Sequence, residues 1–326
     1  MITTVTPNPS LDRTLHVTKL RLGGVNRTSA ESVEPSGKGV NVALALATAG
    51  VPVTAVLPAG GPSGVELLAM LDEAGLDSLT VGIAGSVRSN VTLVEADGRT
   101  TKVNEPGPTL SRREVELLVD SSLRPGTEGD WVAWCGSLPG GFDHTTFAAA
   151  LAAARSAGRR VAVDASGRAL EVALSGGPDG LPHLVKPNAD ELAELTGARL
   201  RTLGDVVRAA RVLVTRGVQT VLVSLGGDGA VLVDEAVCLH GAAPVERVVN
   251  TVGAGDAFLA GYLAVEQNPH ERLASALRFG AVAVQQDGTL LPHGPLAERN
   301  EIACTVGEVE EGRALSAPAG RSGGRG

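Results

Sequence analysis

The sequence predicts an α/β protein in which a mostly parallel sheet is covered on both faces by helices, a three-layer α/β/α arrangement. Three observations support this prediction: short β-branched segments alternate with segments of helical period, the strand segments are almost continuously apolar, and several helical segments end at a glycine. Ala49-Gly50 and Ala157-Gly158 are two such helix ends.

The alternation can be followed along most of the chain. The predicted strands are Ile2–Thr6, Val51–Leu57, Val91–Glu95, Trp131–Cys135, Arg160–Asp164, His183–Lys186, Thr220–Ser224 and Ala230–Val233. The predicted helices are Gly39–Ala49, Ser63–Ala74, Ser111–Ser122, His144–Ala157, Ala189–Thr196, Gly204–Arg216, Ala254–Gln267 and Glu271–Gln286.

Two stretches interrupt the alternation, from about Leu11 to Glu34 and from about Ser86 to Pro106. Both are polar, alternating and poor in helix signals, so we expect them to form a small β-sheet lid over the carboxyl edge of the main sheet. Residues 1–303 are then one domain. From Cys304 to Gly326 the composition turns to Gly, Ser, Arg and Pro, and we expect a disordered, dispensable tail.

Composition limits the classes of partner. The net charge of −8 and a pI near 5.3 argue against nucleic acid as the main partner. No apolar run approaches the length of a membrane span, and the three cysteines are widely spaced, as is typical of buried thiols in a reducing compartment. We therefore expect a cytoplasmic protein that binds neither nucleic acid nor membrane.

The most informative segment is Val249–Phe258, where Gly253-Ala254-Gly255 opens a helical pattern and Asp256 follows at once. A glycine-rich turn at a helix start leaves backbone N–H groups unpaired beside the positive end of the helix dipole, which favours an anion. A carboxylate there suits proton abstraction from a hydroxyl that attacks a phosphoryl group. Taken alone, Asp256 is equally explained as a helix cap.

A second glycine turn, Gly37-Lys38-Gly39, opens the helix that runs to Ala49. It is not a Walker A loop, because Gly39 stands where that motif has Ser or Thr for magnesium. No Rossmann G-x-G-x-x-G is present either, since Phe258 occupies the sixth place after Gly253. A lone surface lysine would be solvated, but inside such a turn Lys38 favours a phosphate contact.

Further polar residues follow strand ends or glycine turns, where open α/β sheets bind their ligands. Asp12 follows the first strand and could accept hydrogen bonds from sugar hydroxyls, although an Asx turn explains it as well. Arg88 could bind a phosphate through its guanidinium fork. Glu191, three residues after Asn188, also matches a helix capping pattern.

Together, the order and spacing of these motifs resemble the PfkB/ribokinase family of sugar kinases over residues 1–293. Thr251–Phe258 is similar to that family's carboxyl-terminal signature and Ser36–Ala43 to its amino-terminal one, with Ser36 where many members have glycine. Its phospho-hexose branch is similar at the following segments: Thr6–Asp12, Val25–Arg27, Asn104–Pro108, Gly136–Pro139 and Lys186–Asn188. The resemblance implies the ribokinase-like fold.

The resemblance also implies roles by position. The catalytic base would be Asp256, with an anion hole formed by the amides of Gly253, Ala254, Gly255 and Asp256 itself. Sugar hydroxyls would be held by Asp12, Gly37 and Asn41. A phosphate already on the sugar would be surrounded by Arg27, Lys38, Arg88 and Ser137. ATP would be bound by Asn188, Glu191, Ser224, Gly226 and Gly229.

These expectations describe an ATP- and magnesium-dependent kinase that phosphorylates a hydroxymethyl group of a sugar phosphate. No direct metal ligand is assigned, since Mg²⁺ would come with ATP, with Glu191 nearby. Fructose 1-phosphate is the first choice of substrate, with tagatose 6-phosphate and fructose 6-phosphate as alternatives and a non-catalytic sugar-phosphate sensor as a rival of another class. A homodimer through the lid is a further expectation, while dependence on a monovalent cation stays open.

Overall fold

The structure is a computed structural model that describes residues 1–177, 180–286, 288 and 302–316. Its centre is a ten-stranded sheet in the order β14-β13-β12-β11-β10-β9-β8-β1-β4-β5. In chain order the strands are β1 (Ile2–Val5), β4 (Val53–Ala59), β5 (Ser78–Gly82), β8 (Trp131–Cys135), β9 (Arg160–Asp164), β10 (Leu184–Val185), β11 (Thr220–Ser224), β12 (Ala230–Asp234), β13 (Cys238–Ala242) and β14 (Thr305–Glu308). Neighbouring strands are parallel from β5 to β11 and antiparallel from β11 to β14.

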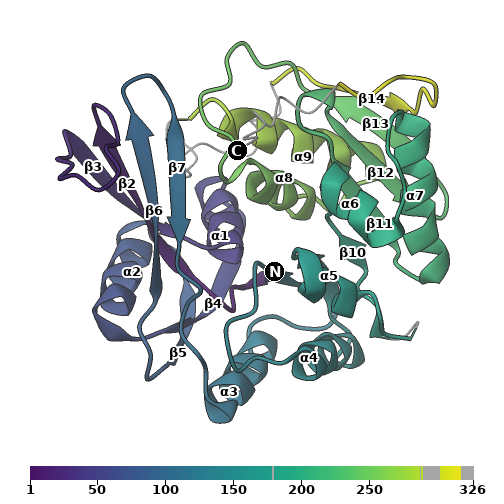
Figure 1. Cartoon of the computed structure of the whole chain (residues 1–326). Coiled ribbons are helices and arrows are strands. Elements are labelled where there is room, and N and C mark those ends of the chain that lie inside the picture. The colour runs from purple at the N-terminus through teal and green to yellow at the C-terminus, as the bar shows by residue number, and fades with distance from the viewer. Residues whose placement is uncertain (178–179, 287, 289–301, 317–326) are drawn as a thin grey trace.

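Helices cover both faces of this sheet (Figure 1). One face carries α1 (Lys38–Thr48), α2 (Gly61–Glu73), α8 (Ala254–Leu263) and α9 (Pro269–Ala283). The other carries α3 (Arg112–Leu123), α4 (His144–Ser156), α5 (Gly167–Ala173), α6 (Ala189–Thr196) and α7 (Leu203–Arg216). The predicted three-layer arrangement with a mostly parallel sheet is confirmed.

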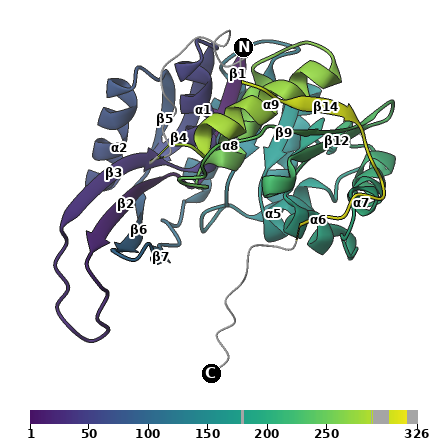
Figure 2. The same cartoon turned by 90° about the horizontal axis from the view of Figure 1, so that it is seen from above.

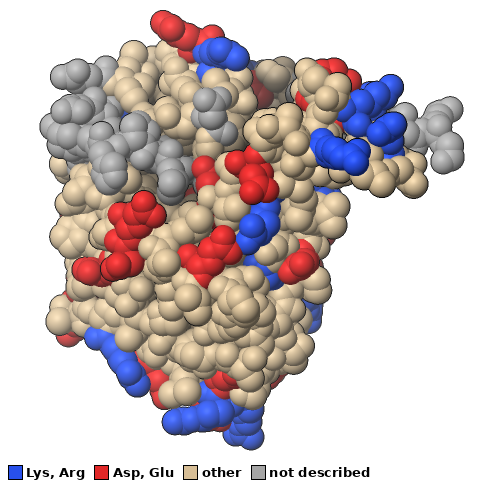
Figure 3. Space-filling view, turned by 90° about the vertical axis from the view of Figure 1, so that its left-hand side faces the viewer, with Lys and Arg blue, Asp and Glu red and all other residues tan. Residues whose placement is uncertain are grey.

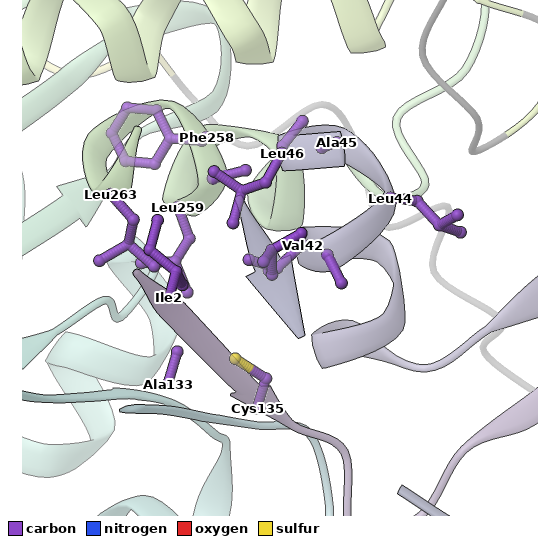
Figure 4. Packing of buried hydrophobic residues seen from close by; sticks show 14 of the residues in the cluster. Ile2, Val42, Leu44, Ala45, Leu46, Ala133, Cys135, Phe258, Leu259 and Leu263 are labelled. Carbon is purple, nitrogen blue, oxygen red and sulfur yellow. The ribbon is translucent and has the colours of Figure 1, made fainter. Parts of the chain in front are cut away.

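The core follows from the two-residue period of the strands. In β8, Trp131, Ala133 and Cys135 pack toward α1 and α8, whereas Val132 and Trp134 pack toward α4 on the opposite face. Figure 4 shows the first of these layers, where Leu46 of α1 and Leu259 of α8 meet above Ile2 of β1. This packing fixes the amino-terminal ends of α1 and α8 relative to the sheet.

A second, four-stranded sheet forms the lid, in the order β3-β2-β6-β7. Its strands are β2 (Ser10–Val17), β3 (Ala30–Ser36), β6 (Arg88–Glu95) and β7 (Thr100–Asn104). β2 pairs parallel with β6, and the other two pairings are antiparallel. Figure 2 shows the hairpin of β2 and β3 reaching away from the main sheet. The predicted small sheet is confirmed.

The prediction of a disordered tail from Cys304 is wrong for the part that the structure describes. Thr305–Glu308 form β14, which pairs antiparallel with β13 in the register His240 opposite Gly307. Val306 packs against one core layer, while Val309 and Leu315 pack against the other. These apolar residues are spaced through a polar stretch, so the average composition concealed them. The domain therefore extends through residue 316, and 317–326 lie outside the described residues.

Other differences are local. The helix predicted as Ala254–Gln267 ends at Leu263, because Asn268 caps a new helix that starts at Pro269: its side chain accepts a hydrogen bond from the Glu271 amide. Elements that the sequence reading omitted are α5, β5, β13 and β14.

Two surface findings accompany the fold. No helix within the described ranges is both long and apolar enough to cross a membrane. Acidic and basic side chains are interspersed on the face shown in Figure 3, without a continuous basic patch. A basic patch of that kind is the usual electrostatic footprint of nucleic-acid binding.

The contact between α8 and α9 gives a stability test. A Cβ atom added at Gly261 would lie 2.5 Å from the Ser275 carbonyl oxygen and 2.8 Å from the Ala276 Cα, both in the backbone of α9. We expect Gly261→Ala to lower the free energy of unfolding by about 1–3 kcal/mol, the usual cost of overpacking. Urea denaturation measures it.

Gly280→Ala is the matched control in α9. Its added Cβ would have Phe258 Cβ as nearest neighbour at 3.7 Å, an ordinary contact distance. Because alanine favours a helix over glycine by about 0.8–1 kcal/mol, this variant should be as stable as the unaltered protein or slightly more so. Equal effects of the two changes would contradict the packing argument.

Candidate active site

Loops at the carboxyl edge of the main sheet bring together segments that are far apart in the chain. β1, β8, β9, β10 and β11 are neighbours in the parallel part of the sheet, so their carboxyl ends meet at one edge. Asn8 follows β1, Ser137 follows β8, Asp164 ends β9, Lys186 follows β10 and Ser224 ends β11. The amino-terminal ends of α1 and α8 reach this same group, as the contacts described next show.

Asp256 lies in the first turn of α8, where the helix starts from a left-handed glycine, Gly253, with φ of 76°. Within the described residues the amides of Gly255 and Asp256 have no hydrogen-bond acceptor, whereas Ala257 N already bonds to the Gly253 carbonyl at 2.8 Å. Two free N–H groups at the positive end of a helix form an anion hole. Of the four amides predicted for the hole, those of Gly255 and Asp256 are thus available, whereas Ala254 N donates to the Thr251 carbonyl at 3.4 Å.

The Asp256 carboxyl group is buried, with 7% of the residue exposed. Asn41 of α1 donates from Nδ2 to Asp256 Oδ2 at 2.8 Å, which fixes the carboxylate in orientation. Burial and the nearby charge of Asp164 raise the pKa of Asp256 to about 7, because both disfavour its ionised form. A carboxyl group with such a pKa is well suited to act as a base at neutral pH.

Asp164, which the sequence reading did not select, is fully buried between two lysines. Its Oδ1 is 2.8 Å from Lys38 Nζ and its Oδ2 is 3.1 Å from Lys186 Nζ. Burial opposes ionisation, but the two ammonium groups outweigh it and hold the pKa of Asp164 below its usual range.

The two lysines belong to the transfer end of the site. Burial disfavours the charged form of Lys38, yet Asp164 outweighs it and the pKa of Lys38 is raised, with smaller contributions from Asp256 and Glu191. Lys186 lies beside the anion hole, since a Cβ atom added at Gly255 would be 3.4 Å from its Nζ. Positive charge is thus concentrated where a phosphoryl group would be transferred.

Asp12 joins three lid strands through its carboxylate. Ser10 Oγ and Asn90 Nδ2 each donate to Asp12 Oδ1 at 2.9 Å, and Ser36 Oγ donates to Oδ2 at 3.0 Å. The carboxylate is therefore held in one orientation while Oδ2 keeps a lone pair for another donor. Its predicted role with a sugar hydroxyl is compatible with this geometry.

Asn8 connects two other predicted residues. Its Nδ2 donates to Ser137 Oγ at 3.2 Å, and its carbonyl accepts from Arg88 Nε at 3.3 Å. The oxygens Asn8 Oδ1 and Asn41 Oδ1 are buried without a hydrogen-bond partner in the described structure. Because a buried acceptor without a partner is costly, each of these oxygens is available to accept a hydrogen bond from a group that enters the site.

Gly37 sits where a side chain would collide with the loop after β1. Its φ is 116°, and an added Cβ atom would lie 2.7 Å from Thr6 Cγ2 and 3.1 Å from Pro9 Cα. Glycine is required here by both space and backbone conformation. This close approach brings the start of α1 against the segment that carries Asn8 and Asp12.

One cavity of about 500 Å³ extends from the anion hole between α8, α9 and the turn after β11. Its walls include Ser224, Gly226 and Gly229, which were predicted to bind ATP, together with Ala254 and Gly255. Apolar side chains complete it: Val245, Val248, Phe258 and Leu277. The structure therefore brings three of the five predicted nucleotide residues and part of the predicted anion hole into one continuous space.

Asn188 and Glu191 form the capping box of α6, with Asn188 Oδ1 accepting from Glu191 N at 2.8 Å and Glu191 Oε2 from Asn188 N at 2.9 Å. Neither residue lines the cavity just described. The two residues therefore cap α6, as the capping pattern in the sequence indicated. The charge of Glu191 also raises the pKa of Lys38, so Glu191 lies on the side of the site that holds Lys38 and Asp256.

The structure separates the cations predicted to surround one phosphate. The charges that act on Arg88 are those of Asp12 and Glu105, whereas those that act on Lys38 are Asp164, Asp256 and Glu191. Arg27 is exposed in the connection between β2 and β3, and its guanidinium makes no hydrogen bond or ion pair with any described residue. Arg88 and Ser137 are connected through Asn8. Gly136, which precedes Ser137, lies close to Lys38, because a Cβ atom added at Gly136 would be 3.8 Å from Lys38 Cβ.

Three functional residues were missed as individual candidates: Asn8, Asp164 and Lys186. Each follows or ends a parallel strand, and that position was the available signal. The sequence analysis treated Asp164 only as the last residue of a strand and did not consider it as a site residue.

The site geometry agrees with what comparison of the sequence shows. Residues 8–293 match the sequence profile described as pfkB family carbohydrate kinase. The chain belongs to this family. The family and the class of enzyme predicted from the motifs, an ATP-dependent sugar kinase, are confirmed.

Similar proteins lie in the same family. The chain is 37% identical to a 1-phosphofructokinase of Rhodobacter capsulatus, over 91% of this chain and 94% of that protein. It is 35% identical to the ATP-dependent 6-phosphofructokinase isozyme 2 of Escherichia coli, over 86% and 90%. A crystal structure of phosphofructokinase-2 from Escherichia coli in complex with substrates and products superposes with a TM-score of 0.85 at 33% identity, covering 92% of this chain and 98% of that one.

The role of Asp256 can be tested by Asp256→Asn, which keeps size and removes the base. We expect kcat to fall by about two to four orders of magnitude, the usual range for loss of a general base. Because the pKa of Asp256 is about 7, kcat/KM of the unaltered kinase should rise with pH and level off above that value. The variant should lack this rise, while any ionisation of a phosphorylated substrate near pH 6 remains in both profiles.

Stability provides the control. With its folded pKa near 7 and an unfolded pKa of about 3.9, Asp256 binds more protons in the native state, so its stabilising contribution is complete below pH 4 and is lost as pH rises through 7. Asp256→Asn should therefore have a Tm at pH 8 no lower than the unaltered chain. A loss of turnover below tenfold would contradict the assignment of Asp256 as the base. The alternative of a helix cap does not fit the structure, because the cap residue of α8 is Gly253 and no side chain caps the helix.

Proposed function

We propose that the protein is a 1-phosphofructokinase, which transfers the γ-phosphoryl group of ATP to the 6-hydroxyl of fructose 1-phosphate and releases fructose 1,6-bisphosphate and ADP. The proposal rests on the charge arrangement of the lid side of the site together with the relatives that carry that name. Tagatose 6-phosphate and fructose 6-phosphate are the alternative acceptors. A non-catalytic sensor is disfavoured, because it would not need a base beside an anion hole.

The observation that carries the proposal is Arg88. It is half-buried on β6, and burial lowers its pKa although Asp12 and Glu105 act in the opposite direction. Its Nε and Nη1 donate to Asn8 O, Asn90 Oδ1 and Glu105 O, but within the described chain its guanidinium forms no ion pair and Nη2 has no acceptor. A partly desolvated cation without an ion pair favours an anionic ligand, here the phosphate already on the sugar.

In the proposed reaction Asp256 accepts the proton of the 6-hydroxyl while that oxygen forms a bond to the γ-phosphorus and the bond to the β-phosphate oxygen breaks. Asn41 keeps the carboxylate oriented toward the hydroxyl through the contact at 2.8 Å. The free amides of Gly255 and Asp256 stabilise charge on the transferred group. The lid covers the sugar side and limits access of water that would hydrolyse ATP.

Lys38 and Lys186 supply positive charge to the same group in this proposal. Each ammonium group lies against one oxygen of Asp164, so one carboxylate is shared by two lysines. The surplus of one positive charge favours arrival of the polyphosphate. This assignment moves Lys38 from the phosphate of the sugar, where the motif reading had it, to the phosphoryl group in transfer.

The family implies a divalent metal, and we propose Mg²⁺ bound with ATP. Mg²⁺ is usually held by one or two carboxylates together with substrate phosphates and several waters. Glu191 fits this role. Its Oε2 accepts from the Asn188 amide, which holds the carboxylate in place, and its charge acts on Lys38, so it lies toward the transferred phosphoryl group. No group of three or more His, Cys, Asp or Glu suited to a metal occurs among the described residues. The bound metal would neutralise charge on the phosphates.

The segment Asn104–Pro108 supports a phosphorylated hexose as the acceptor. In the structure, the Glu105 carbonyl accepts from Arg88 Nη1 at 3.0 Å and its carboxylate accepts from the Ser89 amide at 2.8 Å. The Pro106 carbonyl accepts from Asn8 Nδ2 at 3.0 Å. This segment, which is similar to the phospho-hexose branch, therefore shapes the surroundings of the proposed phosphate contact.

Homodimerisation through the lid is part of the proposal. Leu22 and Val25, in the connection between β2 and β3, are 92% and 69% exposed, and Val103 of β7 is 58% exposed. Exposed apolar side chains on both edges of a projecting sheet favour a partner surface. A second copy of the lid would cover them.

The substrate proposal is tested by measuring kcat/KM with fructose 1-phosphate, tagatose 6-phosphate, fructose 6-phosphate and fructose under identical ATP and magnesium. We expect fructose 1-phosphate to be preferred and fructose to be slower by a factor on the order of 10³ or more, because the site would be left with an unpaired cation. A tenfold preference for tagatose 6-phosphate would change the substrate and keep the mechanism. A preference for free fructose would contradict the reading of Arg88.

Arg88→Met should weaken binding of fructose 1-phosphate by about 1.5–3 kcal/mol, as expected for a charge-assisted hydrogen bond, with little effect on unphosphorylated fructose. Arg13→Met is the matched control on the same lid sheet, since Arg13 Nη2 is engaged 2.7 Å from Glu66 on α2. Its KM for fructose 1-phosphate should stay unchanged. Equal losses on fructose and on its phosphate would contradict the assignment.

A further inference from the structure

The segment 309–316, which follows β14, crosses the start of α7. The Leu203 amide donates to Arg313 O at 2.9 Å, and the Gly204 amide donates to Glu311 O at 3.0 Å. Leu203 and Gly204 are the first two residues of α7, whose amides have no acceptor within the helix. Leu315 N also donates to Arg201 O at 2.9 Å. The segment therefore completes the hydrogen bonding of this helix end, which explains why it lies there.

The last described residue of this segment reaches the turn after β11. Ser316 N donates to Asp228 Oδ2 at 2.7 Å, and Ser316 Oγ donates to Asp228 Oδ1 at 2.9 Å. Both carboxylate oxygens are thus bound by one residue that is 88 positions away in the chain. Hydrogen bonds to an ionised acceptor are among the stronger ones in proteins.

Asp228 belongs to the run Gly226-Gly227-Asp228-Gly229, in which η2 (Gly226–Asp228) is a single 3₁₀ turn. All three glycines line the 500 Å³ cavity, whereas Asp228 does not. Gly226 and Gly229 have φ of 59° and 86°, so the turn depends on the conformational freedom of glycine. The turn is held from outside the cavity at Asp228, by Ser316 and by His240 Nε2, which donates to the Asp228 carbonyl at 2.8 Å.

We infer that Ser316 positions the Gly226–Gly229 turn and that the segment 309–316 thereby sets the affinity of the cavity for its nucleotide. The inference rests on the proposed function in taking an adenine nucleotide as the occupant. A glycine-rich turn loses much conformational entropy when it becomes ordered around a ligand. Docking of the segment orders the turn beforehand, so that binding no longer carries that cost. Ser316 touches no substrate and acts through Asp228.

Ser316→Ala removes one of the two hydrogen bonds and leaves the backbone contacts of the segment. We expect the KM for ATP and the calorimetric Kd for ADP to rise about three- to tenfold, the range for loss of a single hydrogen bond. The kcat and the KM for fructose 1-phosphate should stay within about twofold, because Asp256 and the lid are untouched. In the ligand-free protein, hydrogen exchange of the Asp228 and Gly229 amides should become faster.

Two truncations form a matched pair. Ending the chain after Ala314 removes Leu315 and Ser316 and should raise the Kd for ADP at least as much as Ser316→Ala. Ending it after Gly320 keeps the contact and should change neither affinity nor exchange. Asp228→Asn should weaken ADP binding like Ser316→Ala, and the double variant should show less than the sum, because the two residues share one interaction.

The outcomes separate this inference from the proposed function. Normal ADP binding by the unaltered chain, with unchanged affinity and unchanged exchange in Ser316→Ala and in the truncation after Ala314, overturns the inference alone. Failure of the unaltered chain to bind ADP overturns both. A rise in Kd that is matched by an equal rise in the KM for fructose 1-phosphate also overturns it, because that result indicates a general loss of structure.

Discussion

A buried carboxylate shared between two lysines organises the site. Asp164 ends β9 with no exposed surface and bonds Lys38 at the start of α1 and Lys186 after β10, so it joins a helix on one face of the sheet to two adjacent strands. Removing one partner of a buried ion pair typically lowers the free energy of unfolding by about 3–5 kcal/mol, because the remaining charge stays desolvated. The same negative charge contributes to the raised pKa of Asp256. Geometry and proton affinity at the transfer point therefore have a common origin.

Much of the fold could be predicted from the hydrophobic period of the sequence and from the residues that end helices and strands. β8 and β11 were predicted with their observed bounds, because β8 is continuously apolar, β11 has an apolar centre, and a glycine follows each strand within two residues. β14 was missed because Thr305, Gly307 and Glu308 give no apolar alternation, and its strand character comes from pairing with β13. The boundary between α8 and α9 involves a single capping residue, Asn268, which starts α9 at Pro269. The local sequence pattern does not show which strands pair in the fold, and it does not resolve element boundaries that depend on a single capping residue.

A candidate site residue could be recognised in the sequence where its immediate neighbours in the chain form a distinctive motif. Asp256 was recognisable because two glycines precede it. Asp164 stands in an ordinary strand, so its importance depends on Lys38, which is distant in sequence. The motif predicts a phosphate contact for Lys38, and the fold adds an ion pair with Asp164 that the motif did not indicate. A motif identifies which residues are special, but only the fold decides which of them meet.

The sheet order has a consequence for how the sheet is closed. β1 is paired on both sides, by β4 and β8, whereas β13 depends for its outer pairing on β14, which follows it in the chain only after α8 and α9. Until Thr305–Glu308 have paired, β13 presents an open backbone edge on which another strand can pair. A folding intermediate that lacks β14 therefore exposes a strand edge that favours association between molecules.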